Sequence, residues 1–167
     1  RLRDQGADVR VVVTPAGKAF ITPLTLQAIS GNPVHDSLLD TSAEAGMGHI
    51  ELARWADQIV VAPASADFIA RLATGLADTL LSTLCLASEA PITIAPAMNH
   101  VMWKNTAVKE NKRTLINRGI SIIEPMIGDQ ACGETGIGRM PEPEFIVETL
   151  INKIINLYND LLSILNL

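Results

Sequence analysis

The 167-residue chain is poor in aromatic residues, in cysteine and in clustered positive charge, and each shortage excludes a class of protein. Only 4% of the residues are aromatic while 48% are hydrophobic, so a buried core has to be mostly aliphatic. Two cysteines are too few for a disulfide framework, which favours a reducing, cytoplasmic setting. A net charge of -5 with no cluster of lysine and arginine argues against nucleic acid as a partner. The sequence shows no signal-peptide pattern and no run of about 18 apolar residues, so we expect no membrane span.

Short apolar runs rich in β-branched residues alternate with stretches typical of helices. Strands are predicted at residues 8–14, 58–62, 92–95 and 120–123. Helices are predicted at residues 18–30 with an interruption near Pro23, 49–56, 68–86 with a break at Gly75, and 106–118. This alternation with short connections predicts an α/β fold: a doubly wound, Rossmann- or flavodoxin-like parallel sheet flanked by helices. Residues 1–6 look like the last turn of a helix closed by glycine, so we expect a first strand and phosphate-binding turn to precede them.

The last third of the chain is different. Residues 124–143 show no periodicity and are rich in glycine, which predicts a long functional loop after the last short strand. Residues 144–167 return to a helical pattern, with one apolar seam at Val147, Leu150, Ile154, Leu157, Leu161 and Ile164. A second row widens this stripe at Ile151, Ile155, Tyr158, Leu162 and Leu165. Such a stripe has to pack on the domain, on another subunit or on a partner domain.

Residues 96–103, Pro-Ala-Met-Asn-His-Val-Met-Trp, follow a predicted buried strand directly. Ligands of open α/β sheets bind beyond the carboxyl ends of the strands, so this is a candidate binding loop. The carboxamide of Asn99 has two donor hydrogens that suit a carboxylate. The residues alone leave a second interpretation open, in which Asn99 only caps a helix and the apolar residues are core.

Two further strand ends carry hydroxyls, Thr14 and Ser65. A hydroxyl at a helix N-terminus suits a phosphate or a flavin edge, and it equally suits an ordinary cap. His49 follows a glycine at the start of a predicted helix, where a neutral imidazole could accept a proton, although a structural role is also open. We expect His35 and His100 to face solvent.

The two cysteines lie in contrasting contexts. Cys85 is embedded in an apolar helix and is predicted to be a core residue. Cys132 lies among glycines in the long loop, where a thiol could meet a ligand and move with a lid, or be incidental to the surface. No metal site is predicted.

The motif P-x-M-N-x-x-M-W resembles that of the homo-oligomeric flavin-containing cysteine decarboxylases, and the resemblance extends over about residues 1–147. It is closest to the phosphopantothenoylcysteine decarboxylases of bacterial coenzyme A biosynthesis. The resemblance implies a decarboxylase domain at residues 1–147, with residues 124–143 as a substrate-covering flap and residues 144–167 as a C-terminal helix that could lead to a synthetase domain. It also implies a homotrimer, or an assembly of trimers, with the flavin site at the subunit boundary.

The resemblance further implies roles for individual residues. Contacts to FMN are expected from Thr14, Phe20, Ser65 and Ala66. Substrate contacts are expected from Ala97, Met98, Asn99, Ala131 and Gly133. The implied catalytic residues are His49 as base, Asn99 as holder of the substrate carboxylate, and Cys132 as proton donor.

The implied reaction converts phosphopantothenoylcysteine to phosphopantetheine. Oxidation of the substrate by the flavin places its carboxylate β to a C=S group, which lets CO2 leave, and reduction then restores the thiol. The alternatives are a peptidyl-cysteine decarboxylase, which stops at the enethiol and needs no counterpart of Cys132, and a non-catalytic flavoprotein regulatory subunit. Flavin prenyltransferases share the fold but lack the motifs.

Overall fold

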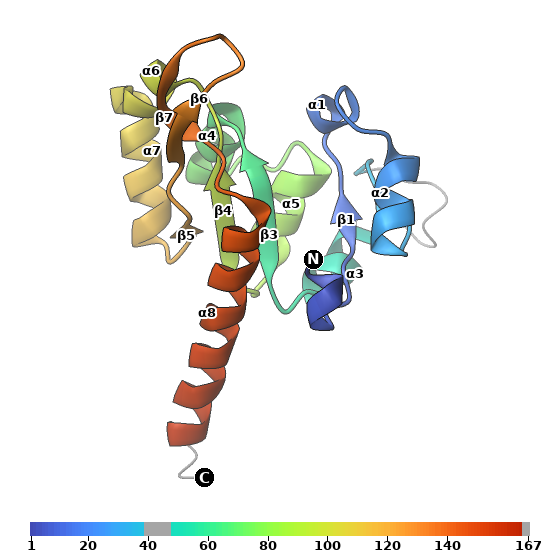
Figure 1. Ribbon diagram of the computed structural model, residues 1–167. Coiled ribbons are helices and arrows are strands. Elements are labelled where there is room, and N and C mark those ends of the chain that lie inside the picture. Colours follow the sequence, from blue (N-terminus) through green and yellow to red (C-terminus); the bar gives the residue numbers. More distant parts are fainter. Residues whose placement is uncertain (39–47, 165–167) are drawn as a thin grey trace.

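A computed structural model describes residues 1–38 and 48–164 (Figure 1). Its strands are β1 (Val11–Val12), β2 (Val34–His35), β3 (Ile59–Ala64), β4 (Ile92–Pro96), β5 (Ser121–Ile122), β6 (Met126–Asp129) and β7 (Thr135–Arg139). Its helices are the 3-10 turn η1 (Arg3–Gln5), α1 (Pro15–Lys18), α2 (Pro23–Ser30), α3 (Gly48–Trp55), α4 (Ala66–Thr74), α5 (Leu80–Ala87), α6 (His100–Lys104), α7 (Thr106–Asn117) and α8 (Pro143–Ile164). Residues 165–167, the end of the predicted C-terminal helix, lie outside the described residues.

The parallel strands form two sheets rather than one continuous sheet. β1 pairs with β2, and β3, β4 and β5 lie side by side in that order. Two helices lie between the strands of each parallel pair along the chain. The alternating pattern predicted a helical connection for β3–β4 and for β4–β5, whereas β2 was not among the predicted strands. The α/β class with parallel sheets flanked by helices is therefore confirmed.

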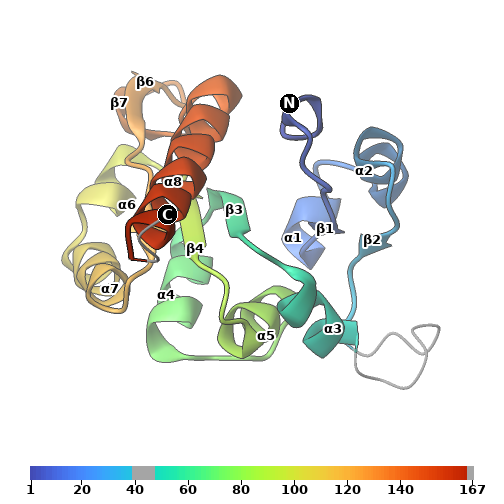
Figure 2. The same cartoon turned by 90° about the horizontal axis from the view of Figure 1, so that it is seen from below.

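Both faces of the β3–β5 sheet are covered, which explains why its strands are apolar at nearly every position. Ile59 and Val61 are buried against α4 and α5, while Val60 between them points to the opposite face and packs with Ile146 and Leu150 of α8. Figure 2 shows β3 and β4 between α8 on one side and α4 with α5 on the other. The buried residues are largely aliphatic, as the composition predicted.

Three helices start directly where a parallel strand ends. The side chains of Thr14, Ser65 and Asn99 cap the N-termini of α1, α4 and α6, accepting hydrogen bonds from backbone amides. These helix starts lie towards the same end of the molecule, opposite the C-terminal end of α8 (Figure 1). β3 runs two residues further than predicted, because Ala64 still pairs with Pro96 across a register shift.

Residues 124–143 are not an irregular loop, and residues 120–123 are not the last strand: both predictions were wrong. β6 and β7 form an antiparallel hairpin that pairs Gly128 with Gly136 and Asp129 with Thr135. Backbone hydrogen bonds hold this hairpin together. Because most of its side chains are exposed, and glycines occupy both strands, it leaves no alternating apolar pattern in the sequence.

α8 begins against the domain and then extends away from it (Figure 1). Ile146 and Leu150 are buried, whereas Ile154, Ile155 and Tyr158 are at least half exposed. The domain therefore covers only the first turns of the predicted apolar stripe. Of the helices in the described ranges, α8 included, none has the length and apolar character needed to cross a bilayer.

The α7 helix offers a direct test of the core. Leu115 is completely buried, so Leu115→Ala is expected to lower the free energy of unfolding by about 2–5 kcal/mol through the cavity that it leaves. The adjacent Ile116 is 49% exposed, and Ile116→Ala should cost less than about 1 kcal/mol. Urea unfolding followed by circular dichroism measures both, and equal losses would contradict this packing.

Candidate active site

The loop between β4 and α6 contains the Met-Asn motif. Its backbone is fixed at Ala97, whose amide donates to the carbonyl of Ala64 at 3.1 Å. Asn99 is indeed a helix cap, because its Oδ1 accepts a hydrogen bond from the amide of Val101 at 2.8 Å. This cap uses only the oxygen of the carboxamide and leaves the two hydrogens of its nitrogen for other partners.

The β6–β7 hairpin lies directly on this loop. The amide of Met98 donates to the carbonyl of Gly138 at 3.0 Å, and a Cβ at Gly138 would lie 2.1 Å from the Met98 carbonyl oxygen. A Cβ at Gly136 would lie 2.7 Å from the Cβ of His100. Only glycine permits so close an approach, so the glycines that obscured the hairpin in the sequence are what let it dock.

Docking brings Asn99 and Cys132 together although 33 positions separate them. The Nδ2 of Asn99 donates to Oε2 of Glu134 at 2.8 Å and lies 3.2 Å from Oε1 of Gln130 and 3.4 Å from the sulfur of Cys132. The thiol itself lies 3.4 Å from Oε2 of Glu134. An amide, a thiol and a carboxylate thus meet between the hairpin turn and the start of α6.

Glu134 was not singled out in the sequence. Its pKa is lowered, first by the hydrogen bond from Asn99, then by the one from Cys132, with a smaller contribution from His100. Its position two residues after Cys132, inside the same turn, is the signal that could have found it.

The expectation that His35 and His100 face solvent was wrong. His35 lies on β2 and is half-buried. His100 has a side chain that is 23% exposed, and its Nδ1 lies 3.5 Å from Oε2 of Glu134. His100 is covered because the hairpin packs Gly136 against its ring.

The other residues expected to contact substrate flank this cluster. Ala97 and Met98 are half-buried at the end of β4, while Ala131 and Gly133 are exposed in the hairpin turn. The turn is closed by a hydrogen bond of 2.9 Å from the amide of Gly133 to the carbonyl of Gln130.

The residues expected to contact a flavin lie at two strand ends. Thr14 accepts from the amide of Gly17 at 3.1 Å, and Ser65 accepts from the amide of Phe68 at 3.2 Å. Each hydroxyl keeps its own hydrogen as a donor. Phe20 is 92% exposed beyond α1, and Ala66 is the first residue of α4.

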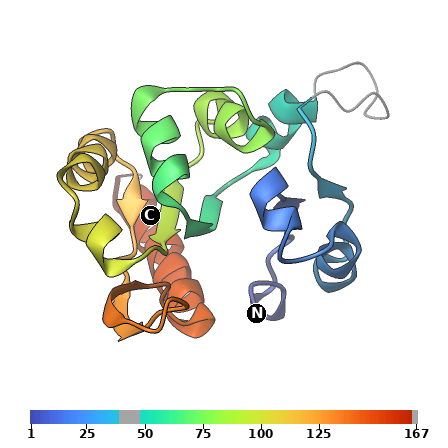
Figure 3. The same ribbon diagram turned by 90° about the horizontal axis from the view of Figure 1, so that it is seen from above.

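His49 is not part of the cluster around Asn99. It lies in the first turn of α3, which packs against α5, and both ribbon views place α3 away from α6 and the hairpin (Figures 1 and 3). The side chain is half-buried, and within the described residues its buried Nδ1 has no hydrogen-bond partner. One chain therefore brings together two of the three expected catalytic residues.

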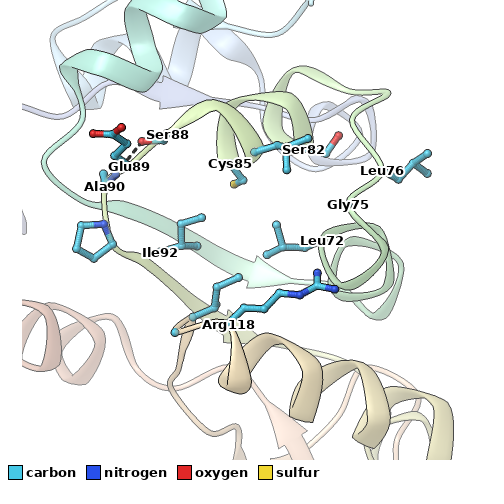
Figure 4. A pocket seen from close by; sticks show the side chains of 14 residues that line it. Leu72, Gly75, Leu76, Ser82, Cys85, Ser88, Glu89, Ala90, Ile92 and Arg118 are labelled. Carbon is cyan, nitrogen blue, oxygen red and sulfur yellow. Dashed lines mark hydrogen bonds between the residues drawn. The ribbon is translucent and has the colours of Figure 1, made fainter.

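A cavity of about 360 Å³ lies elsewhere, near the start of β4 and the end of α7 (Figure 4). Leu72, Cys85, Ile92 and Arg118 line it, and the guanidinium of Arg118 donates to the carbonyl of Ala73 at 2.8 Å. Its lining includes Ile92 and Ile120 at the amino ends of β4 and β5 and none of the residues around Asn99, so it is separate from that cluster. Cys85 is buried there, as predicted, and burial raises the pKa of its thiol to about 12.

The sequence of this chain matches a known protein family along most of its length. The Flavoprotein family matches residues 1–155. The Coenzyme A biosynthesis bifunctional protein CoaBC of Haemophilus influenzae is 61% identical over 149 residues, which are 89% of this chain and 37% of that protein. The chain thus spans little more than a third of the length of this relative.

Two solved structures of similar proteins also match this chain over most of its length. A PPC decarboxylase, a cysteine-to-serine mutant complexed with pantothenoylaminoethenethiol, matches with a TM-score of 0.77 and 34% identity over 89% of this chain and 84% of that one. The FMN binding protein AtHal3 matches with a TM-score of 0.74 and 34% identity, over 89% of this chain and 83% of that one. The chain belongs to the Flavoprotein family.

The lowered pKa of Glu134 gives a testable pH dependence. Its ionised carboxylate stabilises the docked hairpin above the ordinary pKa of 4.5, and this contribution is lost as the pH falls through the lower folded value. A carbon-13 NMR titration of the Glu134 carboxyl group should give a midpoint below 4.5 that rises in Asn99→Ala. Asn105→Ala removes the corresponding cap of α7 and should leave the midpoint unchanged. An unchanged midpoint in Asn99→Ala would contradict the contact.

Proposed function

We propose that this chain forms the decarboxylase part of an FMN-dependent phosphopantothenoylcysteine decarboxylase, which produces phosphopantetheine for coenzyme A biosynthesis. Membership of the Flavoprotein family, the CoaBC relatives and the structural likeness to a PPC decarboxylase support this function. The observation that carries the proposal is the contact between the carboxamide of Asn99 and the thiol of Cys132. Conversion of a cysteine substrate to a saturated, decarboxylated thiol needs both a holder for the carboxylate and a proton donor.

The strand ends have the chemistry that FMN requires. The free hydroxyl hydrogens of Thr14 and Ser65 and the N-terminus of α4 suit phosphate or flavin oxygens. Phe20 offers an exposed aromatic face, and the small Ala66 leaves room for a ring. When bound, the flavin would supply both the two-electron acceptor for the oxidation and the donor for the later reduction, which no side chain in this chain can replace.

The chain's own residues bind the substrate and move protons. Asn99 holds the substrate carboxylate through its Nδ2, and Ala97, Met98, Ala131 and Gly133 enclose the rest of the cysteine moiety. His49 takes the proton of the substrate thiol through a neutral nitrogen of its imidazole. After CO2 has left, Cys132 donates to the substrate carbon the proton that, together with the two electrons returned by the reduced cofactor, would give the saturated thiol.

A peptidyl-cysteine decarboxylase is the less favoured alternative. Such an enzyme has no use for a thiol held at the carboxylate-binding amide, because its reaction stops at the enethiol. A non-catalytic regulatory subunit would need neither an amide that holds a carboxylate nor a thiol beside it. The thiol of Cys132 at 3.4 Å from Asn99 therefore favours the full decarboxylation and reduction.

We propose a homotrimer, or an assembly of trimers, in which a neighbouring subunit completes the site. The separation of His49 from Asn99 within one chain and the exposed apolar residues of α8 support this arrangement.

The bifunctional relatives support a fused synthetase domain in the whole protein. A cytoplasmic setting suits a thiol substrate and the free thiol of Cys132.

Substitution of the two proton-transfer residues should separate the two halves of the reaction. His49→Asn is expected to abolish CO2 release, because no base accepts the thiol proton. Cys132→Ser is expected to release CO2 but accumulate the oxidised enethiol, identified by mass spectrometry. The matched control is Cys85→Ala, which changes a buried cysteine outside the site and should still give phosphopantetheine. Undiminished phosphopantetheine from Cys132→Ser would refute the assigned role.

Mixing the same two variants tests whether the site is shared between subunits. Neither His49→Asn nor Cys132→Ser alone should form the saturated product. Co-expressed at equal levels, they should restore roughly a quarter of the wild-type sites, because some sites receive His49 from one subunit and Cys132 from its neighbour. Phosphopantetheine formation by the purified mixed oligomer is the measurement. No recovery in a mixed oligomer would place both residues in a site within one subunit.

A further inference from the structure

The donor capacity of the Asn99 carboxamide is fully used. Its nitrogen carries two hydrogens. Three acceptors, one each from Glu134, Gln130 and Cys132, lie within 3.4 Å of the nitrogen, so they already compete for these two hydrogens. A substrate carboxylate can gain a hydrogen bond from this amide only by displacing one of them.

Glu134 is the exchangeable partner of the three. Gln130 is anchored a second time, because its Oε1 also accepts from the backbone amide of His100 at 3.1 Å. The thiol of Cys132 makes the longest and weakest of the three contacts, so its displacement frees little of the donor capacity of Asn99. Glu134 makes the shortest contact with Asn99, at 2.8 Å, yet its side chain is 55% exposed in the hairpin turn and can swing into solvent.

Electrostatic repulsion means that the carboxylate of Glu134 has to leave the Asn99 amide when a substrate carboxylate binds there. Two carboxylates at one amide repel each other, and no lysine or arginine hydrogen-bonds or ion-pairs with Glu134 among the described residues. A basic group that does face it is His100, whose Nδ1 lies 3.5 Å away and is charged only when protonated. The carboxylate of Glu134 therefore resembles, in charge and position, the group that Asn99 is proposed to hold.

We propose that Glu134 is a specificity-determining residue, an internal carboxylate that occupies the Asn99 amide whenever no substrate carboxylate is bound. This inference rests on the proposed function. A carboxylated ligand has to replace Glu134, so part of its binding free energy is spent on the exchange. A decarboxylated product leaves Glu134 in place. When CO2 leaves, Glu134 returns to Asn99 and keeps the amide satisfied. Glu134 thus sets the ratio of affinities for substrate and product.

The test compares Glu134→Gln with Asp129→Asn in the full-length, flavin-loaded protein. Glutamine can still accept from Asn99 but lacks the charge that makes this hydrogen bond strong. Asp129 lies in the same hairpin, loses the same charge on substitution, and hydrogen-bonds to Thr135 instead of Asn99. It is therefore a matched control.

The ligands are phosphopantothenoylserine, whose hydroxyl replaces the reactive thiol, and its decarboxylated ethanolamine counterpart. Calorimetry should show that Glu134→Gln lowers the Kd of the serine compound about three- to tenfold and leaves that of the ethanolamine compound within about twofold. Asp129→Asn should change neither Kd by more than about twofold. Equal shifts for both ligands, or no shift for either, would overturn the inference.

A measurement without ligand separates this inference from the proposed function. Hydrogen exchange of the Met98 amide, which donates to Gly138, should be faster in Glu134→Gln than in wild type and unchanged in Asp129→Asn. Unchanged exchange in Glu134→Gln overturns the role of Glu134 and leaves the decarboxylase proposal intact. Failure of wild type to bind either ligand overturns the proposed function, and this inference with it.

Discussion

The hydrogen bond from the Met98 amide to the Gly138 carbonyl ties the β6–β7 hairpin to the loop after β4. It forms only because Gly138 has no side chain, since a Cβ there would collide with the Met98 carbonyl. The contacts around the Asn99 nitrogen follow from this docking. It covers His100 and carries Cys132 to Asn99. It also places a carboxylate against the amide proposed to hold the substrate carboxylate.

Asn99 shows how one side chain can serve structure and function at once. Its oxygen caps α6 and fixes the orientation of the carboxamide, while its nitrogen faces the hairpin and donates to Glu134. The two interpretations that the sequence left open for this residue are therefore compatible. A cap that appears purely structural in the sequence becomes a rigid donor in the fold, because each atom of the carboxamide has its own partner.

Sequence patterns predicted the elements whose side chains are buried. β3, β4 and the helices around them were predicted because burial on both faces demands apolar residues, and the aliphatic core was predicted for the same reason. The hairpin was missed because its strands pair through glycine backbones, which carry no periodic signal. The burial of His100 was missed for a related reason: the hairpin that covers it is distant in the sequence.

The sequence by itself determined the α/β class, the polar residues at the strand ends and the family motif around Asn99, because each depends on residues close together in the chain. Only the tertiary structure decided that Cys132 and Glu134 meet Asn99 and that His49 does not, since loop docking sets distances between remote segments. Local sequence patterns indicate whether a residue is buried in the core or lies at the end of a strand. The partner that it meets there depends on how glycine lets two backbones approach.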